Sequence, residues 1–137
     1  MVHRDEIRNL GHALLRLGIG IVLLWFGFSQ LKNPASWTRL LPEFTQAFGF
    51  APTSLIYING IFEVTLAILL ITGLLTRLVG FIAGVHILYI AYLLGYGPTA
   101  VRDLGLALAA FSVALHGADD YCLDHLAQST HRVFSNF

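Results

Sequence analysis

Four long apolar runs, separated by polar or proline-containing segments, dominate the chain. They cover about residues 12–31, 54–75, 78–96 and 98–117. Each is close to the roughly 20 residues that an α-helix needs to cross the ~30 Å hydrocarbon core of a bilayer. A soluble helix bundle would show polar residues every few positions on its outer faces, and these runs do not. The pattern therefore predicts an all-α integral membrane protein, an antiparallel bundle of four transmembrane helices.

The segment between the first two runs, residues 32–54, is rich in proline and aromatic residues. Its prolines disfavour a continuous helix. A polar loop would not need aromatic rings, whereas such rings are typical of the membrane–water interface. We therefore expect an interfacial loop or a short amphipathic helix around residues 37–48. The prolines and aromatics are Pro34, Pro42, Pro52, Trp37, Phe44, Phe48 and Phe50.

The composition agrees with a membrane protein. Apolar residues make up 56% of the 137 residues and charged residues 12%, against about 25% in a typical soluble domain. The mean hydropathy is +0.72. The length indicates a single domain over residues 1–137, with a polar tail at 118–137. The net charge is zero, so nothing points to nucleic acid as a partner, and lipids are the expected neighbours of the helices.

The positive charges predict an orientation. On the side of both termini lie Arg4, Arg8, Arg77 and Arg132. On the other side lie Lys32, Arg39 and Arg102. Cytoplasmic segments carry the excess of positive charge, so both termini are predicted to be cytoplasmic. Candidates for interfacial or lipid-headgroup contacts are Lys32, Trp37, Arg77 and Arg102.

Each predicted helix carries an ionisable residue on a stripe that can face the bundle interior. A charged side chain inside a bilayer costs about 2.5–3.5 kcal/mol on insertion scales, so it should face the protein and have a partner. We expect Glu63, near the middle of the second helix, to pair with Arg16, with His86 or with the neighbours Arg102 and Asp103. The candidate polar intramembrane site is Arg16, Glu63, His86, Tyr89 and Asp103.

These side chains fit two functions. They can hold the helices in register, or they can handle protons beside a quinone, because a quinone site needs a hydrogen-bond donor and a proton source next to an apolar slot. Glu63, His86 and Tyr89 supply those groups. A bis-histidine haem would need two imidazoles at matched depth, for which His12 and His116 are the open alternative.

The sequence gives no metal site and no catalytic residue. The segment "CLDH" (122–125), even with His131, lacks the four ligands of a structural zinc site. Nucleophile, phosphate-loop and dinucleotide motifs are absent, so the chain is not expected to catalyse a reaction alone. Gly80 and Gly84 form a GxxxG motif away from the His86 face, which predicts a protein partner or a homo-oligomer.

Three segments resemble the DoxX family. "LLRLGIGIVLLWFGFSQLKNP" (14–34) has its arginine near the start, a glycine midway and a lysine after the helix. "NGIFEVTLAILLITGLLTRL" (59–78) has an acid before a leucine-rich run, a glycine and an arginine. "YGPTAVRDLGLALAAFSVALHGADDYCLD" (96–124) opens with an acidic residue and ends in a glycine turn and Leu-Asp. There are two departures: Gln30 separates Ser29 from Leu31, and "HGADDYCLD" carries two acids where a basic residue is common.

The resemblance implies a four-helix membrane protein of a bacterial or archaeal cytoplasmic membrane. Members of the family include a subunit of a thiosulfate:quinone oxidoreductase and partners of other membrane redox systems. We therefore expect a small subunit of a quinone-linked redox complex that anchors a catalytic partner and helps to shape a quinone site, without an intrinsic cofactor. The alternative is a purely structural or assembly subunit with no redox role. The family positions carried over are Arg16, Lys32, Glu63, Arg77 and Asp103.

Overall fold

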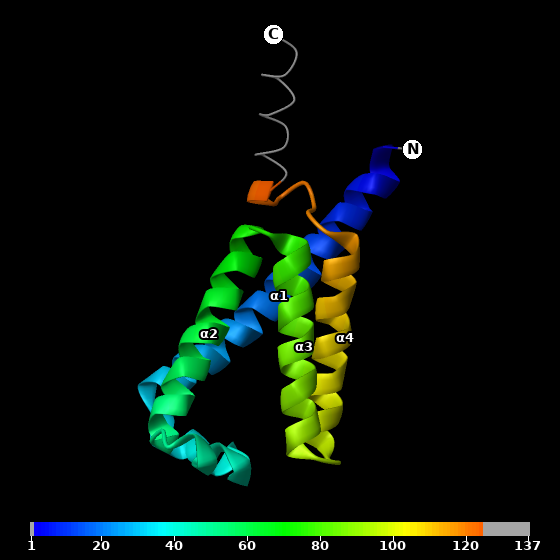
Figure 1. Cartoon of the computed structure of the whole chain (residues 1–137). Coiled ribbons are helices and arrows are strands. Elements are labelled where there is room, and N and C mark those ends of the chain that lie inside the picture. Colours follow the sequence, from blue (N-terminus) through cyan, green and yellow to red (C-terminus); the bar gives the residue numbers. More distant parts are fainter. Residues whose placement is uncertain (1, 125–137) are drawn as a thin grey trace.

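Four long helices make up most of the protein. The computed structural model describes residues 2–124, with side chains described for 4–45, 47 and 49–124. The helices are α1 (Val2–Lys32), α2 (Pro52–Thr72), α3 (Thr76–Leu94) and α4 (Pro98–His116) (Figure 1). All four are long and apolar enough to cross a membrane. The predicted all-α, four-helix membrane fold is therefore confirmed.

Helix α1 begins ten residues before the predicted position 12, because the polar segment at its start continues the same helix. Its 31 residues span about 46 Å at 1.5 Å per residue, more than the ~30 Å hydrocarbon core. The N-terminal end accordingly extends past the ends of the other helices (Figure 1). The other three helices begin and end within three residues of their predicted bounds.

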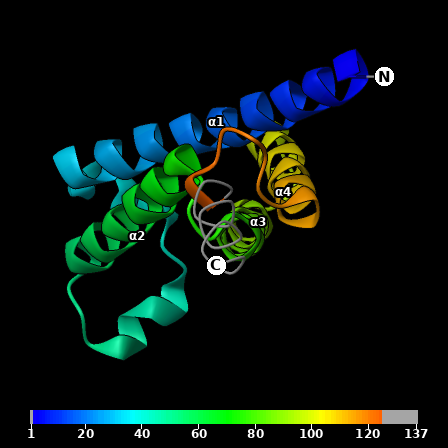
Figure 2. The same cartoon turned by 90° about the horizontal axis from the view of Figure 1, so that it is seen from above.

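The helices form two pairs that diverge from each other. α1 packs along α2, and α3 packs along α4. α2 and α3 meet at their short connecting turn and separate toward the opposite end, so the two pairs enclose a wedge (Figures 1 and 2). The core lies where the pairs touch, and its most buried members are Ala67, Leu70, Val79, Ala83, Ala107, Ala110 and Val113.

Small residues allow the helices to pack closely within both pairs. In α3, a Cβ on Gly80 would lie 3.0 Å from the backbone nitrogen of Ala114, and one on Gly84 would lie 2.7 Å from the Phe111 ring. The GxxxG motif is therefore used inside the chain, between α3 and α4. The motif therefore does not support the predicted protein partner or homo-oligomer, because α4 already covers this face, and the partner itself stays a prediction.

The outer surface is apolar, as lipid contact requires. Large hydrophobic side chains point outward along every helix, where hydrocarbon tails replace water as the solvent. These lipid-facing residues include Ile21, Trp25, Phe28, Ile61, Ile68, Phe81, Leu108 and Leu115.

Two short 3₁₀ helices, η1 (Pro34–Leu40) and η2 (Glu43–Phe48), connect α1 to α2 in place of one amphipathic helix. Pro42 falls in the break between them, because proline disfavours helical geometry in the residue before it. η1 packs against α1 and α2, and the Trp37 ring meets the Phe26 ring edge-on at 5.8 Å between centroids. Beyond α4, residues 117–124 form a segment, called the strap below, that crosses over the α2–α3 turn (Figures 1 and 2).

Candidate functional site

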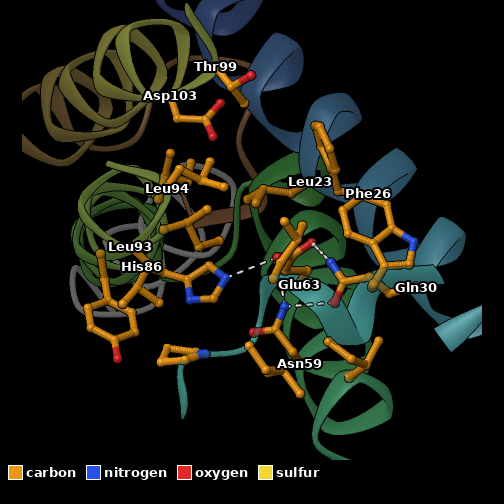
Figure 3. Close-up of a pocket in the computed structure, with 18 of the residues that line it drawn as sticks. Leu23, Phe26, Gln30, Asn59, Glu63, His86, Leu93, Leu94, Thr99 and Asp103 are labelled. Carbon is orange, nitrogen blue, oxygen red and sulfur yellow. Dashed lines mark hydrogen bonds and ion pairs between the residues drawn. The ribbon is translucent and has the colours of Figure 1, made fainter. Parts of the chain in front are cut away.

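A cavity of about 500 Å³ lies in the wedge between the two helix pairs. All four helices contribute to its walls, and η1 and η2 close part of its rim. The walls are mostly apolar, with a few polar side chains gathered at two places (Figure 3). This size and composition are typical of small-molecule sites, which usually occupy about 300–1,000 Å³.

The first polar group of the cavity is centred on Glu63. Its side chain is 2% exposed and points into the bundle. Gln30 Nε2 donates to Glu63 Oε2 at 2.9 Å, and Asn59 Nδ2 donates to Oε1 at 3.0 Å. His86 Nε2 lies 3.1 Å from the same Oε1 (Figure 3). Each carboxylate oxygen therefore has a nitrogen partner, as burial in a low-dielectric interior demands.

Helix packing explains why these side chains meet. Gly27 of α1 and Gly60 of α2 touch, so the two backbones approach closely. Because α1 and α2 run antiparallel, Gln30 and Glu63, each one turn beyond its glycine, lie on either side of this contact, and the Gln30 side chain reaches along it to Glu63. Asn59 completes the network by donating to Gln30 Oε1 at 2.8 Å.

Of the partners expected for Glu63, the structure places His86 against it. Arg16 lies at the other end of the bundle, and Arg102 pairs with Asp103 instead. Gln30 was missed as a site residue and appeared only as a departure from a family pattern. Its position could have revealed it, because it continues the inward-facing stripe of Arg16 and Gly27 at helical spacing.

Arg102 and Asp103 form the second polar group. Arg102 Nε and Nη2 each lie 2.8 Å from Asp103 Oδ1, and the guanidinium carbon lies 5.5 Å from the centre of the Phe26 ring. Asp103 is buried, at 6% exposure. It lies with Thr99 on the α4 side of the cavity, whereas the Glu63 group lies on the α2 side (Figure 3). Tyr89 also lines the cavity and is half-exposed.

Arg16 belongs to the strap end of the molecule. Its Nε donates to Asp119 Oδ2 at 2.9 Å, and its Nη1 donates to the carbonyl oxygens of Leu70 and Ile71. Burial alone would raise the pKa of Asp119, but hydrogen bonds from Arg16 and from the Tyr121 backbone, with the Arg16 charge, outweigh it and lower that pKa. This ion pair ties α1 to the strap and α2.

The strap also caps α3. Asp124 accepts hydrogen bonds from the backbone nitrogens of Leu75 at 2.9 Å and Thr76 at 2.8 Å, which would otherwise lack partners at the helix start. Cys122 is fully buried against Gly73, where a Cβ would lie 2.6 Å from the Cys122 sulfur and where the left-handed backbone (φ 71°) also favours glycine. The predicted polar tail is therefore, up to residue 124, a structural clamp. Arg132 and His131 lie outside the described residues.

The remaining sequence candidates occupy separate places. Trp37 lines the cavity rim, Lys32 is exposed at the end of α1, and Arg77 packs over Gly117 at the start of the strap. The rings of His12 and His116 stack face to face, 3.4 Å apart at 13°. This arrangement cannot serve a bis-histidine haem, whose iron would need the two imidazoles on opposite sides.

Comparison with known proteins identifies the family. The DoxX family model matches residues 11–96, which run from α1 through α3 and include Gln30, Glu63 and His86. No match was found among curated proteins or among solved structures. The family model covers more than half of the chain, and the fold is the four-helix membrane bundle that the resemblance implied. The chain belongs to the DoxX family.

Proposed function

We propose that this protein is a small membrane subunit of a quinone-linked redox complex, which anchors a catalytic partner and binds the quinone headgroup in its cavity. The observation that carries the proposal is the pair of buried Glu63 and partly buried His86 on the wall of a mostly apolar cavity. Apolar walls suit a lipid-soluble ring and the start of its tail, while the pair offers a hydrogen-bond donor and a proton.

The chemistry divides between the ligand and the chain. A bound quinone takes up two electrons and two protons to become a quinol; the electrons come from the catalytic partner, and the protons come from solvent water, one of them by way of His86. Glu63 holds His86 through Nε2 and so fixes its tautomer, as a carboxylate does beside a catalytic imidazole. The other ring nitrogen, Nδ1, lies on the ring edge away from Glu63 (Figure 3). Nδ1–H of a protonated His86 then donates to a ring oxygen, while Glu63 balances the charge.

Gln30 and Asn59 serve this pair by positioning Glu63. Their amide nitrogens hold both carboxylate oxygens, so the carboxylate stays in place when His86 gains or loses a proton. The same closed network also favours the second candidate function, a structural subunit in which Glu63 only joins α1, α2 and α3. The two functions differ in whether the cavity binds a quinone.

The two tryptophans of the chain provide the test. Trp37 lines the cavity, whereas Trp25 is 63% exposed on the outer face of α1. Trp25→Phe therefore leaves a cavity reporter, and Trp37→Phe leaves a lipid-face reporter. A short-tailed benzoquinone should quench Trp37 saturably and Trp25 in simple proportion to its concentration in the detergent. Identical, non-saturating quenching of both would contradict quinone binding.

The anchoring role needs a separate measurement. The full chain is purified from its native membrane in mild detergent, and the co-purifying proteins are identified and assayed for quinone reduction. A stoichiometric partner with quinone-linked activity supports the proposal. A partner without such activity supports the structural subunit, and a chain that purifies alone contradicts the anchoring role.

A further inference from the structure

Arg102 is a preorganised cation on the cavity wall. Two of its nitrogens meet one oxygen of Asp103, and the Phe26 ring lies beneath the guanidinium. Its side chain is nevertheless 52% exposed. Arginine has five N–H donors in a rigid fork, and within residues 2–124 its only hydrogen-bond acceptor is Asp103. Donors therefore remain for a ligand without any rearrangement.

The surroundings of Arg102 keep it in place. Asp103 is buried beside it, so the pair is neutral overall and tolerates an apolar wall. Asp103 belongs to α4 and Phe26 to α1, so Arg102 is held by elements on both sides of the wedge. The exposed donors sit on a fixed support, which makes recognition of a ligand oxygen directional.

The two polar groups differ in chemistry and in origin. Glu63 and His86 come from α2 and α3, and Arg102 and Asp103 come from α4, yet both line the same cavity (Figure 3). The first group can deliver a proton. The second cannot, because arginine does not lose its proton in proteins, and it can only donate hydrogen bonds and positive charge.

We propose that Arg102 is a specificity-determining residue, which binds the ring oxygen opposite the one that His86 contacts. The inference rests on the proposed function, since it assumes that a quinone occupies the cavity. The site then selects rings that carry two acceptor oxygens on opposite sides, the para-quinones, over rings with one. Arg102 also stabilises negative charge that builds on its oxygen during reduction, because its donors are already fixed in place before the charge appears.

The test uses the Trp25→Phe protein, in which Trp37 reports on the cavity. Two probes are titrated: a short-tailed para-benzoquinone, and a ring with the same tail but one ring oxygen. A hydrogen bond to a charged group is worth about a ten-fold gain in affinity or more, so the unaltered site should prefer the quinone by about that factor. Arg102→Gln should remove this preference by weakening the quinone alone, and Arg102→Lys should restore part of it.

Arg39→Gln is the matched control. Arg39 is exposed on η1 and does not line the cavity, so losing its charge should leave both affinities unchanged. Thermal unfolding of each variant checks that the bundle is intact. If quenching is saturable and each probe binds Arg102→Gln with the same affinity as the parent protein, the inference is overturned while quinone binding is supported. That outcome is also expected if Arg102 contacts a phospholipid headgroup instead. Non-saturable quenching in the parent would overturn the proposed function, and this inference with it.

Discussion

Gly27 of α1 and Gly60 of α2 touch backbone to backbone. A Cβ on Gly27 would lie 2.9 Å from the Gly60 carbonyl oxygen, and a Cβ on Gly60 would lie 3.1 Å from the Gly27 carbonyl oxygen. Both contacts are to backbone, which cannot move aside as a side chain can. The contact lies one turn from Gln30 and Glu63, so it sets the distance across which these two side chains bond.

Gly27→Ala should therefore separate α1 from α2 and weaken the Gln30–Glu63 hydrogen bond. Overpacking of this kind typically costs about 1–3 kcal/mol of stability. The measurement is the thermal unfolding midpoint in detergent, together with Trp37 quenching by a benzoquinone. Gly18→Ala on the same helix is the control, because a Cβ there meets nothing within 4 Å. Equal midpoints for the two variants would show that the close contact does not set the packing.

The sequence predicts the four helices and the inward direction of Glu63 for physical reasons. Run length and the cost of a charge in lipid leave few alternatives. The partner of Glu63 was less determined, because three candidate partners lay on inward stripes. Which candidate pairs with Glu63 depends on the position of the Arg16 side chain. Arg16 is bound by Asp119, which lies in a segment that the sequence shows only as a polar tail. Helix periodicity contains no information about how such a segment folds back.

Breaking the Arg16–Asp119 pair should loosen the strap. Asp119→Asn leaves the Arg16 cation buried without its counter-charge, and such losses cost about 3–5 kcal/mol. The reporter is Cys122, the single cysteine of the chain, which is fully buried and whose thiol pKa is raised by burial. Its labelling by a maleimide at neutral pH should be slow in the native protein and faster by about ten-fold or more in the variant.

The control for this labelling is Asp5→Asn. Asp5 forms an exposed ion pair with Arg8 on α1, with both side chains more than 60% exposed, and such pairs contribute little to stability. Cys122 should then label as slowly as in the native protein. Fast labelling in the native protein, or equal rates in all three proteins, would mean that the ion pair does not keep the strap closed.

The same ion pair predicts how stability depends on pH. The folded-state pKa of Asp119 is lowered, so folding favours the carboxylate. Its stabilisation is fully present above the unfolded pKa, about 4, and is lost as the pH falls through the lower folded pKa. The midpoint difference between native protein and Asp119→Asn should therefore be constant near neutral pH and shrink below about pH 4. A difference that grows on acidification would contradict the assigned direction.

Substitution of Glu63 separates the redox function from the structural one. Glu63→Leu removes an acceptor of Gln30, Asn59 and His86 and leaves the buried Gln30 amide nitrogen unpaired, at a cost of about 1–3 kcal/mol. It should lower the unfolding midpoint strongly. Glu63→Gln keeps an oxygen acceptor and a similar shape, so it should assemble with only a small loss. In the purified complex, however, the neutral amide of this variant can no longer balance the positive charge of a protonated His86.

The decisive measurement is therefore quinone-linked turnover in the Glu63→Gln complex. General acid–base groups typically contribute about 10²–10⁴-fold to rate, so loss of the carboxylate should lower turnover by at least the smaller factor if His86 delivers protons. The unfolding midpoint and partner stoichiometry must stay near those of the native complex for this comparison. If turnover is also unchanged, Glu63 serves only to hold the helices together. If Glu63→Leu also leaves both stability and turnover intact, neither role of the carboxylate is correct.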